Sequence, residues 1–415
     1  MSTRPTSSAG TGWSAARAEE HLLGLELFGM RFGLERMRRL LTVLGSPQEA
    51  FRAIHVVGTN GKSSTVRMTA ALLEAHGVRT GSYLSPHLVR FAERIRIGDA
   101  DLSGPAFGAA IQRAATAAEK VDRTLSGGER VTQFELLTAA ALDELARREV
   151  EVAVVEAGLG GRWDATNVLG ADVCVLTNVG LEHTRWLGPT VPDIAREKLA
   201  VVRPSATLVL GDVDDEVLDL ARRTGARIVR PEPRDVPLRG YQRTNFEAAT
   251  AAATAHYGQL QDAQVAEVAA RVSVPGRLQV IGEQPLTVLD GAHNPSGMAA
   301  LADALPDVVG DRELVAVVSV LDDKDAAGML RALIGNSRAM VFTASRNPRA
   351  LPPATLASLA EQLEGPPSEV VRDPHAALRR ARDLAGPGGA VLATGSIYLV
   401  ADLVGEAAGR RASAL

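Results

Sequence analysis

Short runs of apolar residues alternate along this chain with longer stretches in which apolar residues recur at helical spacing. The runs are rich in valine, leucine and isoleucine and predict strands, at residues 54–57, 152–157, 173–177 and 207–210 in the first part of the chain. The intervening pattern predicts helices over residues 64–77, 131–149 and 193–202. Regular alternation of strands with helices is typical of a parallel α/β fold, and we expect that fold class.

The alternation stops at the polar segment 230–240 and starts again further along the chain. A predicted helix over residues 245–258, closed by a glycine, follows the polar segment. Four more apolar runs then predict a second set of strands, at residues 286–290, 314–320, 339–345 and 390–395. A chain of 415 residues is long enough for two hydrophobic cores. We predict one domain over residues 1–272 and a smaller Rossmann-like α/β domain over residues 273–415.

The first predicted strand runs into a glycine-rich turn that consists of Gly58, Thr59, Asn60, Gly61, Lys62, Ser63 and Ser64. The usual phosphate-binding loop is written G-x-x-x-x-G-K-[ST], and Val56 stands where its first glycine would be. The context is still that of a phosphate site, because glycines let backbone N–H groups approach an anion, a helix begins there, and a lysine neutralises charge. The alternative is a glycine-rich turn that binds no phosphate.

Lysine is scarce in this chain. Of 45 basic residues other than histidine, only four are lysines, Lys62, Lys120, Lys198 and Lys324. Arginine is used wherever either residue would serve, so a lysine can mark a position that needs a compact primary amine. Lys62, in the glycine-rich turn, fits this interpretation. For Lys120, in the polar helical stretch AAEKVDR, chance is the simpler explanation.

Three polar residues, Ser85, Glu156 and His183, lie at or just after the end of a strand or in a connecting loop. Open α/β sheets bind their ligands at that edge. A hydroxyl, a carboxylate and an imidazole would suit Mg²⁺ that is held together with ATP phosphates and water. Each residue alone has a structural alternative, such as a surface histidine or a carboxylate paired with an arginine.

Composition excludes several classes of partner. A formal charge of -4 and a pI near 6.1 give no general attraction to nucleic acid or to an anionic membrane. The first 20 residues contain no apolar run typical of a signal peptide, and no run of 18 apolar residues occurs, so we expect a cytoplasmic protein. The one cysteine, Cys174, lies in an apolar run, which predicts a buried thiol.

Ten stretches of the chain resemble the folylpolyglutamate synthase/dihydrofolate synthase family of the Mur ligase superfamily, in which the shortened loop G-T-N-G-K is normal. They include HVVGTNGKSST, YLSPHLVRFAERIRI, TQFELLTAAAL, VVEAGLGGRWDATNV, LTNVGLEHTRWLG, IAREK, PGRLQVIGEQPLTVLDGAHNPSG and LDDKD. They occur in the order of the family between residues 30 and 400. The resemblance implies an N-terminal P-loop ATPase domain of the Mur ligase type followed by a smaller C-terminal domain.

The resemblance also implies a role for individual positions. ATP phosphates would bind the turn at residues 58–64, and the further ATP contacts would be Asn245, Arg277 and Asp290. Magnesium, in two sites, would be held at Ser85, Glu156 and His183. Lys198, in IAREK, matches a lysine that carries carbon dioxide as a carbamate. Arginine could not form that carbamate, because it stays protonated.

The pterin-binding stretches of the family match Thr132, Gln133, Phe134, Glu135, Trp163, Asp164 and Ala165. From the residues alone, TQFELL is typical of a core helix, so this assignment depends on the resemblance.

The reaction implied by the resemblance is ATP-dependent amide formation. A pteroate or folate carboxylate attacks the γ-phosphate of ATP, ADP leaves, and the α-amino group of L-glutamate captures the acyl phosphate. His293 is a candidate to bind the glutamate or the reacting carboxylate. Because Asp290 and His293 lie in the second domain and Lys62 in the first, we expect domain closure to complete the site. The resemblance also suggests a monomer.

Three residues depart from the family pattern. Ser63 replaces a glycine that is common after the loop lysine, Glu182 replaces an aspartate, and Leu84 replaces a small hydroxyl residue. They leave open a related ligase that joins an amino acid to another carboxylate, in cell-wall or specialised metabolism. A catalytically silent nucleotide-binding regulator would have lost catalytic groups, whereas this chain keeps Lys62, Glu156, His183 and Lys198.

Overall fold

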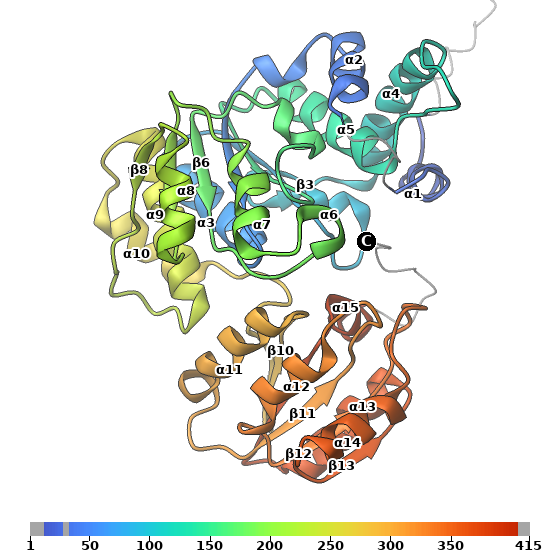
Figure 1. Cartoon of the computed structure of the whole chain (residues 1–415), viewed down its shortest axis with the longest axis vertical. Helices are drawn as coiled ribbons and strands as arrows, with labels where there is room; N and C mark the ends of the chain where they lie inside the picture. The colour runs from blue at the N-terminus through green and yellow to red at the C-terminus, as the bar shows by residue number, and fades with distance from the viewer. Residues whose placement is uncertain (1–11, 28–32, 406–415) are drawn as a thin grey trace, which may run out of the picture.

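The computed structural model describes residues 12–27 and 33–405, and this part of the chain forms two lobes (Figure 1). The first lobe contains an eight-stranded sheet with the strand order β4-β3-β2-β5-β1-β6-β7-β8. Its strands are β1 (Arg52–Val57), β2 (Thr80–Tyr83), β3 (Ile95–Ile97), β4 (Ala100–Asp101), β5 (Val152–Glu156), β6 (Val173–Leu176), β7 (Thr207–Leu210) and β8 (Arg227–Val229). The six strands β2-β5-β1-β6-β7-β8 pair in parallel with their neighbours. At the edge next to β2, β3 and β4 pair antiparallel.

The second lobe contains a six-stranded sheet with the order β13-β12-β11-β14-β10-β9. Its strands are β9 (Gln279–Glu283), β10 (Leu286–Leu289), β11 (Leu314–Val318), β12 (Ala339–Phe342), β13 (Ser368–Val370) and β14 (Ala390–Thr394). Only β9, at one edge of this sheet, pairs antiparallel with its neighbour.

Helices cover both sheets. Those of the first lobe are α1 (Ala15–Leu23), α2 (Glu35–Val43), α3 (Lys62–Ala75), α4 (Gly104–Asp122), α5 (Gln133–Arg147), α6 (Thr184–Leu187), α7 (Val191–Leu199), α8 (Asp215–Arg222), α9 (Tyr241–Tyr257) and α10 (Asp262–Arg271). Those of the second lobe are α11 (Pro295–Val309), α12 (Ala326–Ile334), α13 (Pro353–Gln362), α14 (Pro374–Ala385) and α15 (Ile397–Val404). Within residues 12–27 and 33–405, none of the helices has the length and apolar character needed to cross a membrane.

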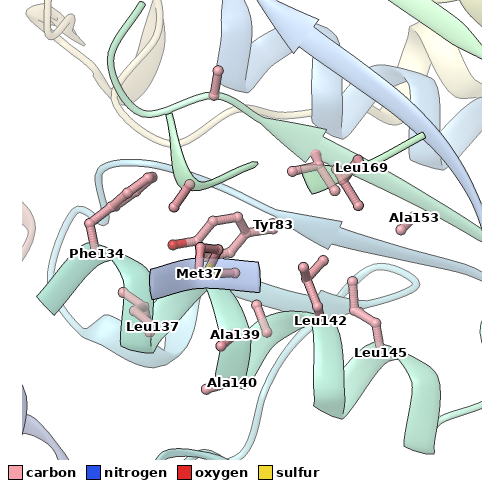
Figure 2. Packing of buried hydrophobic residues seen from close by; sticks show 14 of the residues in the cluster. Met37, Tyr83, Phe134, Leu137, Ala139, Ala140, Leu142, Leu145, Ala153 and Leu169 are labelled. Carbon is pink, nitrogen blue, oxygen red and sulfur yellow. The ribbon is translucent and has the colours of Figure 1, made fainter. Parts of the chain in front are cut away.

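The central strands contribute side chains to two hydrophobic cores, because successive residues of a strand point to opposite faces of the sheet. In β5, Ala153 and Val155 belong to a core with α4 and α5, part of which Figure 2 shows around Tyr83. Val152 and Val154 belong to the other core, with α3, α9 and α10. The second lobe repeats this arrangement, with α11, α12 and α13 on one face and α14 and α15 on the other. Burial on both faces explains why the strands are continuous apolar runs in the sequence.

The predicted fold class is confirmed, and every strand predicted from the sequence is present. The sequence did not predict the strands β2, β3, β4, β8, β9 and β13. The predicted buried thiol is also confirmed, since Cys174 is buried and burial raises its pKa to about 12. The predicted boundary between residues 272 and 273 falls between α10 and β9 and stays a prediction.

The strand order places the candidate site. In the sequence β2-β5-β1-β6, the residues that follow each strand meet at the carboxyl edge of the sheet. Glu156 is the last residue of β5 and pairs in register with Val56 of β1, just before the glycine-rich turn. Ser85 follows β2 and His183 lies in the loop after β6. Four segments far apart in the sequence are thereby brought to one place.

Candidate active site

The turn after β1 can follow its path only because it contains glycines. Gly58 and Gly61 have φ angles of 150° and 84°, which residues with a side chain rarely adopt. A Cβ on Gly58 would lie 1.9 Å from Oγ1 of Thr177, and one on Gly61 would lie 2.3 Å from Oδ1 of Asn245. The backbone of the turn is therefore in close contact both with the end of β6 and with α9.

Lys62 begins α3, and its side chain turns back over the loop. Its Nζ donates hydrogen bonds to the carbonyl oxygens of Gly58, at 3.1 Å, and Thr59, at 3.0 Å. The ammonium thus lies at the N-terminal end of α3, where the helix dipole also favours an anion. This arrangement is suited to a phosphate group.

Glu156 is buried beside the loop. One of its carboxylate oxygens accepts hydrogen bonds from Oγ of Ser63, at 2.8 Å, and from the backbone N–H of Ser85, at 3.1 Å. Burial raises the pKa of Glu156, and the nearby Lys62 acts in the opposite direction. The structure thus brings a carboxylate and two serines, all predicted site residues, into contact.

These oxygen groups fit magnesium better than a metal that needs a complete protein cage. In the part of the chain that the structure describes, no three His, Cys, Asp or Glu side chains come together as a metal centre. Mg²⁺ commonly binds through one or two carboxylates, while substrate phosphates and water complete its shell. The carboxylate of Glu156 with the hydroxyls of Ser63 and Ser85 is a donor set of this kind.

Lys198, in α7, approaches the same loop from within the first lobe. Its side chain is buried, and its Nζ donates a 2.7 Å hydrogen bond to the carbonyl oxygen of Gly58. Burial lowers the pKa of Lys198 from 10.5 to about 7, and the charge of Lys62 acts in the same direction. A large part of the amine is therefore unprotonated near neutral pH, which is the form that reacts with carbon dioxide.

His183 has an unusual backbone conformation at the start of α6. Its φ angle is 52°, in the left-handed region that non-glycine residues rarely adopt, and such residues are frequent at functional sites. Burial lowers the pKa of His183 to about 4, so its imidazole is neutral at neutral pH. Neutral imidazole is the form that binds metals.

Glu182, next to His183, connects the two lobes. Its Oε1 lies 3.2 Å from Nε2 of His293 and 3.6 Å from Nζ of Lys324, both in the second lobe. Burial by itself would raise the pKa of Glu182, but His293 and the surrounding cations hold it well below its usual range. In the sequence, Glu182 was noted only as a departure from the family pattern, and its contact with the second lobe was not predicted.

The predicted ATP contacts outside the loop also lie close together. Asp290 accepts hydrogen bonds from the backbone N–H groups of Leu278 and Ala292, each at 2.8 Å, and from the hydroxyl of Tyr241. Asn245 projects from α9 beside Gly61, and its buried Nδ2 has no hydrogen-bond acceptor among the described residues. An unsatisfied buried donor beside a phosphate loop is available to a ligand.

A cavity of about 530 Å³ joins these groups across the two lobes. The predicted residues that line it are Thr59, Asn60, Gly61, Lys62, Ser63, Ser64, Ser85, Glu156, His183, Asn245, Arg277, Asp290 and His293. Gly58 and Lys198, which are joined by a hydrogen bond, are not among its lining residues. The seven predicted pterin-binding residues do not line it either, and their role stays a prediction.

The first predicted pterin-binding stretch, residues 132–135, makes hydrogen bonds and an ion pair within the first lobe. Thr132 caps α5 by accepting a hydrogen bond from the backbone N–H of Glu135, whose carboxylate accepts one from the backbone N–H of Thr132. Glu135 also pairs with Arg36 at 3.1 Å, and Nε2 of Gln133 donates to the carbonyl oxygen of Leu22 at 2.7 Å. These contacts fix the start of the helix that the residues alone predicted as core.

Phe134 and Asp164 do not line the cavity, but each contacts a residue that does. Phe134 lies beside Tyr83 at the edge of the core in Figure 2, and a Cβ on Gly158, a lining residue, would be 2.5 Å from its ring. Asp164 accepts a 2.7 Å hydrogen bond from the backbone N–H of Leu159, another lining residue. Trp163 is half exposed, and Ala165 is buried.

Some lining residues were not predicted as site residues. Lys324, Tyr241 and Trp186 line the cavity. For Lys324, the scarcity of lysine and the LDDKD stretch were signals in the sequence that could have identified it. Tyr241 and Trp186 carry no comparable signal, because aromatic residues at helical positions are usually core.

Comparison with known proteins supports a family assignment for this geometry. Residues 276–397 match the family of the Mur ligase glutamate ligase domain. The dihydrofolate synthase/folylpolyglutamate synthase of Mycobacterium tuberculosis is 35% identical over 84% of this chain and 82% of its own. Escherichia coli FolC, solved with DHPP and ADP, has a TM-score of 0.84 at 30% identity and covers 96% of this chain and 98% of its own. The bifunctional synthase of Yersinia pestis, solved with Mn, AMPPNP and L-glutamate, has a TM-score of 0.81, the same identity and the same coverage.

Proposed function

The chain belongs to the dihydrofolate synthase/folylpolyglutamate synthase family, and from this we infer that it is an ATP-dependent ligase that adds L-glutamate to a folate-type carboxylic acid. The observation that carries the inference is the cavity between the lobes. It is lined by the phosphate loop and Glu156 from the first lobe and by Asp290 and His293 from the second. The first lobe thus supplies the residues that would bind phosphate and metal. The second lobe contains the residues that match the glutamate ligase domain.

The loop residues neutralise and orient the phosphates. Lys62 and the N-terminus of α3 bind the β- and γ-phosphates of ATP, where two anionic reactants must meet. Glu156, Ser63 and Ser85 would hold a magnesium ion, with His183 as a further ligand, and the ion would supply positive charge at the γ-phosphate. Asn245, Arg277 and Asp290 bind the rest of the nucleotide.

Two transfers complete the reaction. The acceptor carboxylate attacks the γ-phosphorus, the bond to the β-phosphate oxygen breaks, and ADP leaves. The α-amine of L-glutamate then attacks the acyl carbon, inorganic phosphate leaves, and the nitrogen loses a proton. His293 lies at the cavity beside Glu182 and binds the incoming glutamate or the reacting carboxylate.

Lys198 would carry a carbamate in this proposal, and the anion would help to hold a second magnesium ion. Its support is the burial of the amine, the lowered pKa of about 7 and the hydrogen bond from Nζ to the carbonyl oxygen of Gly58 in the phosphate loop. The carbamate would form by attack of the neutral amine on carbon dioxide with release of one proton.

The acceptor is dihydropteroate, the γ-carboxylate of a reduced folate, or both. We propose that its pterin binds the stretches that contain Phe134 and Trp163, next to the cavity wall at Gly158 and Leu159. A Mur-type ligase for a different carboxylate remains the second candidate, because Ser63, Glu182 and Leu84 depart from the family pattern.

The test is incorporation of labelled L-glutamate by purified protein with ATP and magnesium. We compare 7,8-dihydropteroate with tetrahydrofolate as acceptor. The ratio of the two rates shows whether the protein adds glutamate mainly to dihydropteroate or to a reduced folate. Protein that binds ATP but forms no product with either acceptor would favour the second candidate. We also propose that the chain acts as a monomer in the cytoplasm, which light scattering during gel filtration and cell fractionation would test.

A further inference from the structure

Asn60 in the phosphate loop and Asn294 in the second lobe form a reciprocal pair of amides. Nδ2 of Asn60 donates to Oδ1 of Asn294 at 3.2 Å, and Nδ2 of Asn294 donates to Oδ1 of Asn60 at 3.1 Å. Nδ2 of Asn60 also donates to Oγ of Ser296 at 3.0 Å. The pair is a direct contact between the loop and the start of α11.

Both members of the pair are anchored within their own lobe. The backbone N–H of Asn60 donates to Asn178 at 2.9 Å, and its carbonyl accepts from the hydroxyl of Thr177 at 2.6 Å. Asn294 is buried and caps α11 by accepting a 2.7 Å hydrogen bond from the backbone N–H of Gly297. A Cβ on Gly297 would lie 3.0 Å from Oδ1 of Asn294 and 3.3 Å from Oδ1 of Asn60, so a side chain at this position would crowd both amides.

The neighbours of the pair give it its importance. Asn60 is two residues from Lys62 in the phosphate loop, and Asn294 directly follows His293. A movement of one amide relative to the other therefore changes the distance between the phosphate-binding lysine and the histidine of the other lobe. Hydrogen bonds between two amides also depend strongly on direction, which makes such a pair a precise link between lobes.

We propose that Asn294 is a positioning residue, which uses the amide pair with Asn60 to hold the second lobe in the orientation needed for capture of the acyl phosphate by L-glutamate. The inference rests on the proposed ligase function. It predicts that the pair matters for the amino-acid half of the reaction more than for ATP affinity, since the other ATP contacts do not involve Asn294.

Two substitutions separate the pair from the helix cap. Asn294→Asp and Asn294→Ser both keep an oxygen that can cap α11. Aspartate, however, places an acceptor against Oδ1 of Asn60, and serine is too short to keep the pair. The matched control is Asp373→Ala, which removes the cap of α14 in the same lobe, where Asp373 accepts a 2.7 Å hydrogen bond from the backbone N–H of Ala376.

We measure steady-state kinetics for these variants, for Asn60→Ala and for the double variant Asn60→Ala/Asn294→Ser. Each Asn294 variant should lower kcat/KM for L-glutamate by about tenfold, with a smaller change in the KM for ATP, and the double variant should be no worse than the poorer single variant. The control should keep wild-type kinetics. Additive losses in the double variant, or an Asn294→Asp enzyme with wild-type kinetics, would overturn the inference.

A second measurement needs no turnover. Small-angle scattering with an ATP analogue should give a larger radius of gyration for both Asn294 variants than for wild type and Asp373→Ala, and equal radii would contradict the role of the pair. The two proposals fail differently. A wild-type protein without ligase activity contradicts the proposed function, whereas an active wild type with unaffected Asn294 variants contradicts only the positioning role.

Discussion

Replacing Lys198 by arginine tests whether this buried lysine works as a carbamate. The substitution keeps a hydrogen-bond donor near the carbonyl oxygen of Gly58 but replaces the amine that can react with carbon dioxide by a guanidinium that stays protonated. We expect kcat to fall by about 100-fold, the scale on which loss of one electrostatic group reduces the rate. The matched control is Lys120→Arg, since Lys120 is exposed on α4 and should tolerate the change.

The lowered pKa of Lys198 sets the fraction of its amine that is unprotonated. With a pKa of about 7, roughly 90% of Lys198 is unprotonated at pH 8, whereas an ordinary lysine with a pKa of 10.5 is about 0.3% unprotonated. Burial and the charge of Lys62 together therefore increase the unprotonated form by about two orders of magnitude. Because a lowered pKa favours the neutral amine as pH rises, carbamate formation and activity should increase through pH 7 and then level off.

The assay combines rates with detection of the carbamate. Wild-type activity should fall in buffer freed of carbon dioxide and return when bicarbonate is added, and carbon-13 bicarbonate should give a protein-bound carbamate signal that Lys198→Arg lacks. An arginine variant with full activity, with or without carbon dioxide, would refute the reasoning.

Three other substitutions test separate parts of the account. Lys62→Met should lower kcat by about 1000-fold with little change in Tm, because it removes the cation at the phosphates, and unchanged turnover would argue against the loop as the ATP site. Glu182→Gln should reduce the free energy of unfolding at pH 7 by about 3 kcal/mol by breaking the bridge to His293 and Lys324. The lowered pKa of Glu182 means that wild type keeps this contribution above the ordinary value of 4.5 and loses it as pH falls further, so urea unfolding should show a smaller difference at pH 3. Trp163→Ala should raise the KM for the acceptor about tenfold while stability changes by less than about 0.5 kcal/mol, since the side chain is half exposed, and an unchanged acceptor KM would count against the pterin assignment.

The main strands could be predicted because a sheet covered on both faces requires continuous apolar runs. The run VAVVE became β5, and its alternate residues fill two different cores. The strand β2, with the sequence TGSY, could not be predicted in this way, because it contains a glycine and small polar residues and is held by its pairing with β5 and β3. A strand of this composition depends on tertiary pairing more than on its own residues.

The candidate site was predictable where residue type alone carries the chemistry. The glycines and lysine of the loop, and Glu156 at a strand end, were identified from type and position. The contacts between lobes were not, because nothing local in the sequence indicates that Glu182 reaches His293 or that Asn60 pairs with Asn294. Likewise, the helical pattern around Phe134 correctly indicated core, but it could not indicate that the ring packs behind the cavity wall at Gly158.

The most direct test of the central claim follows an oxygen atom from the acceptor carboxylate. Acceptor labelled with oxygen-18 in its reacting carboxylate is incubated with the protein, ATP, magnesium and L-glutamate, and the inorganic phosphate is analysed by mass spectrometry. An acyl phosphate intermediate predicts one labelled oxygen in each phosphate released and one glutamyl product for each ADP. Unlabelled phosphate, or ADP formed without a glutamyl product, would contradict a ligase that activates the acceptor by phosphorylation.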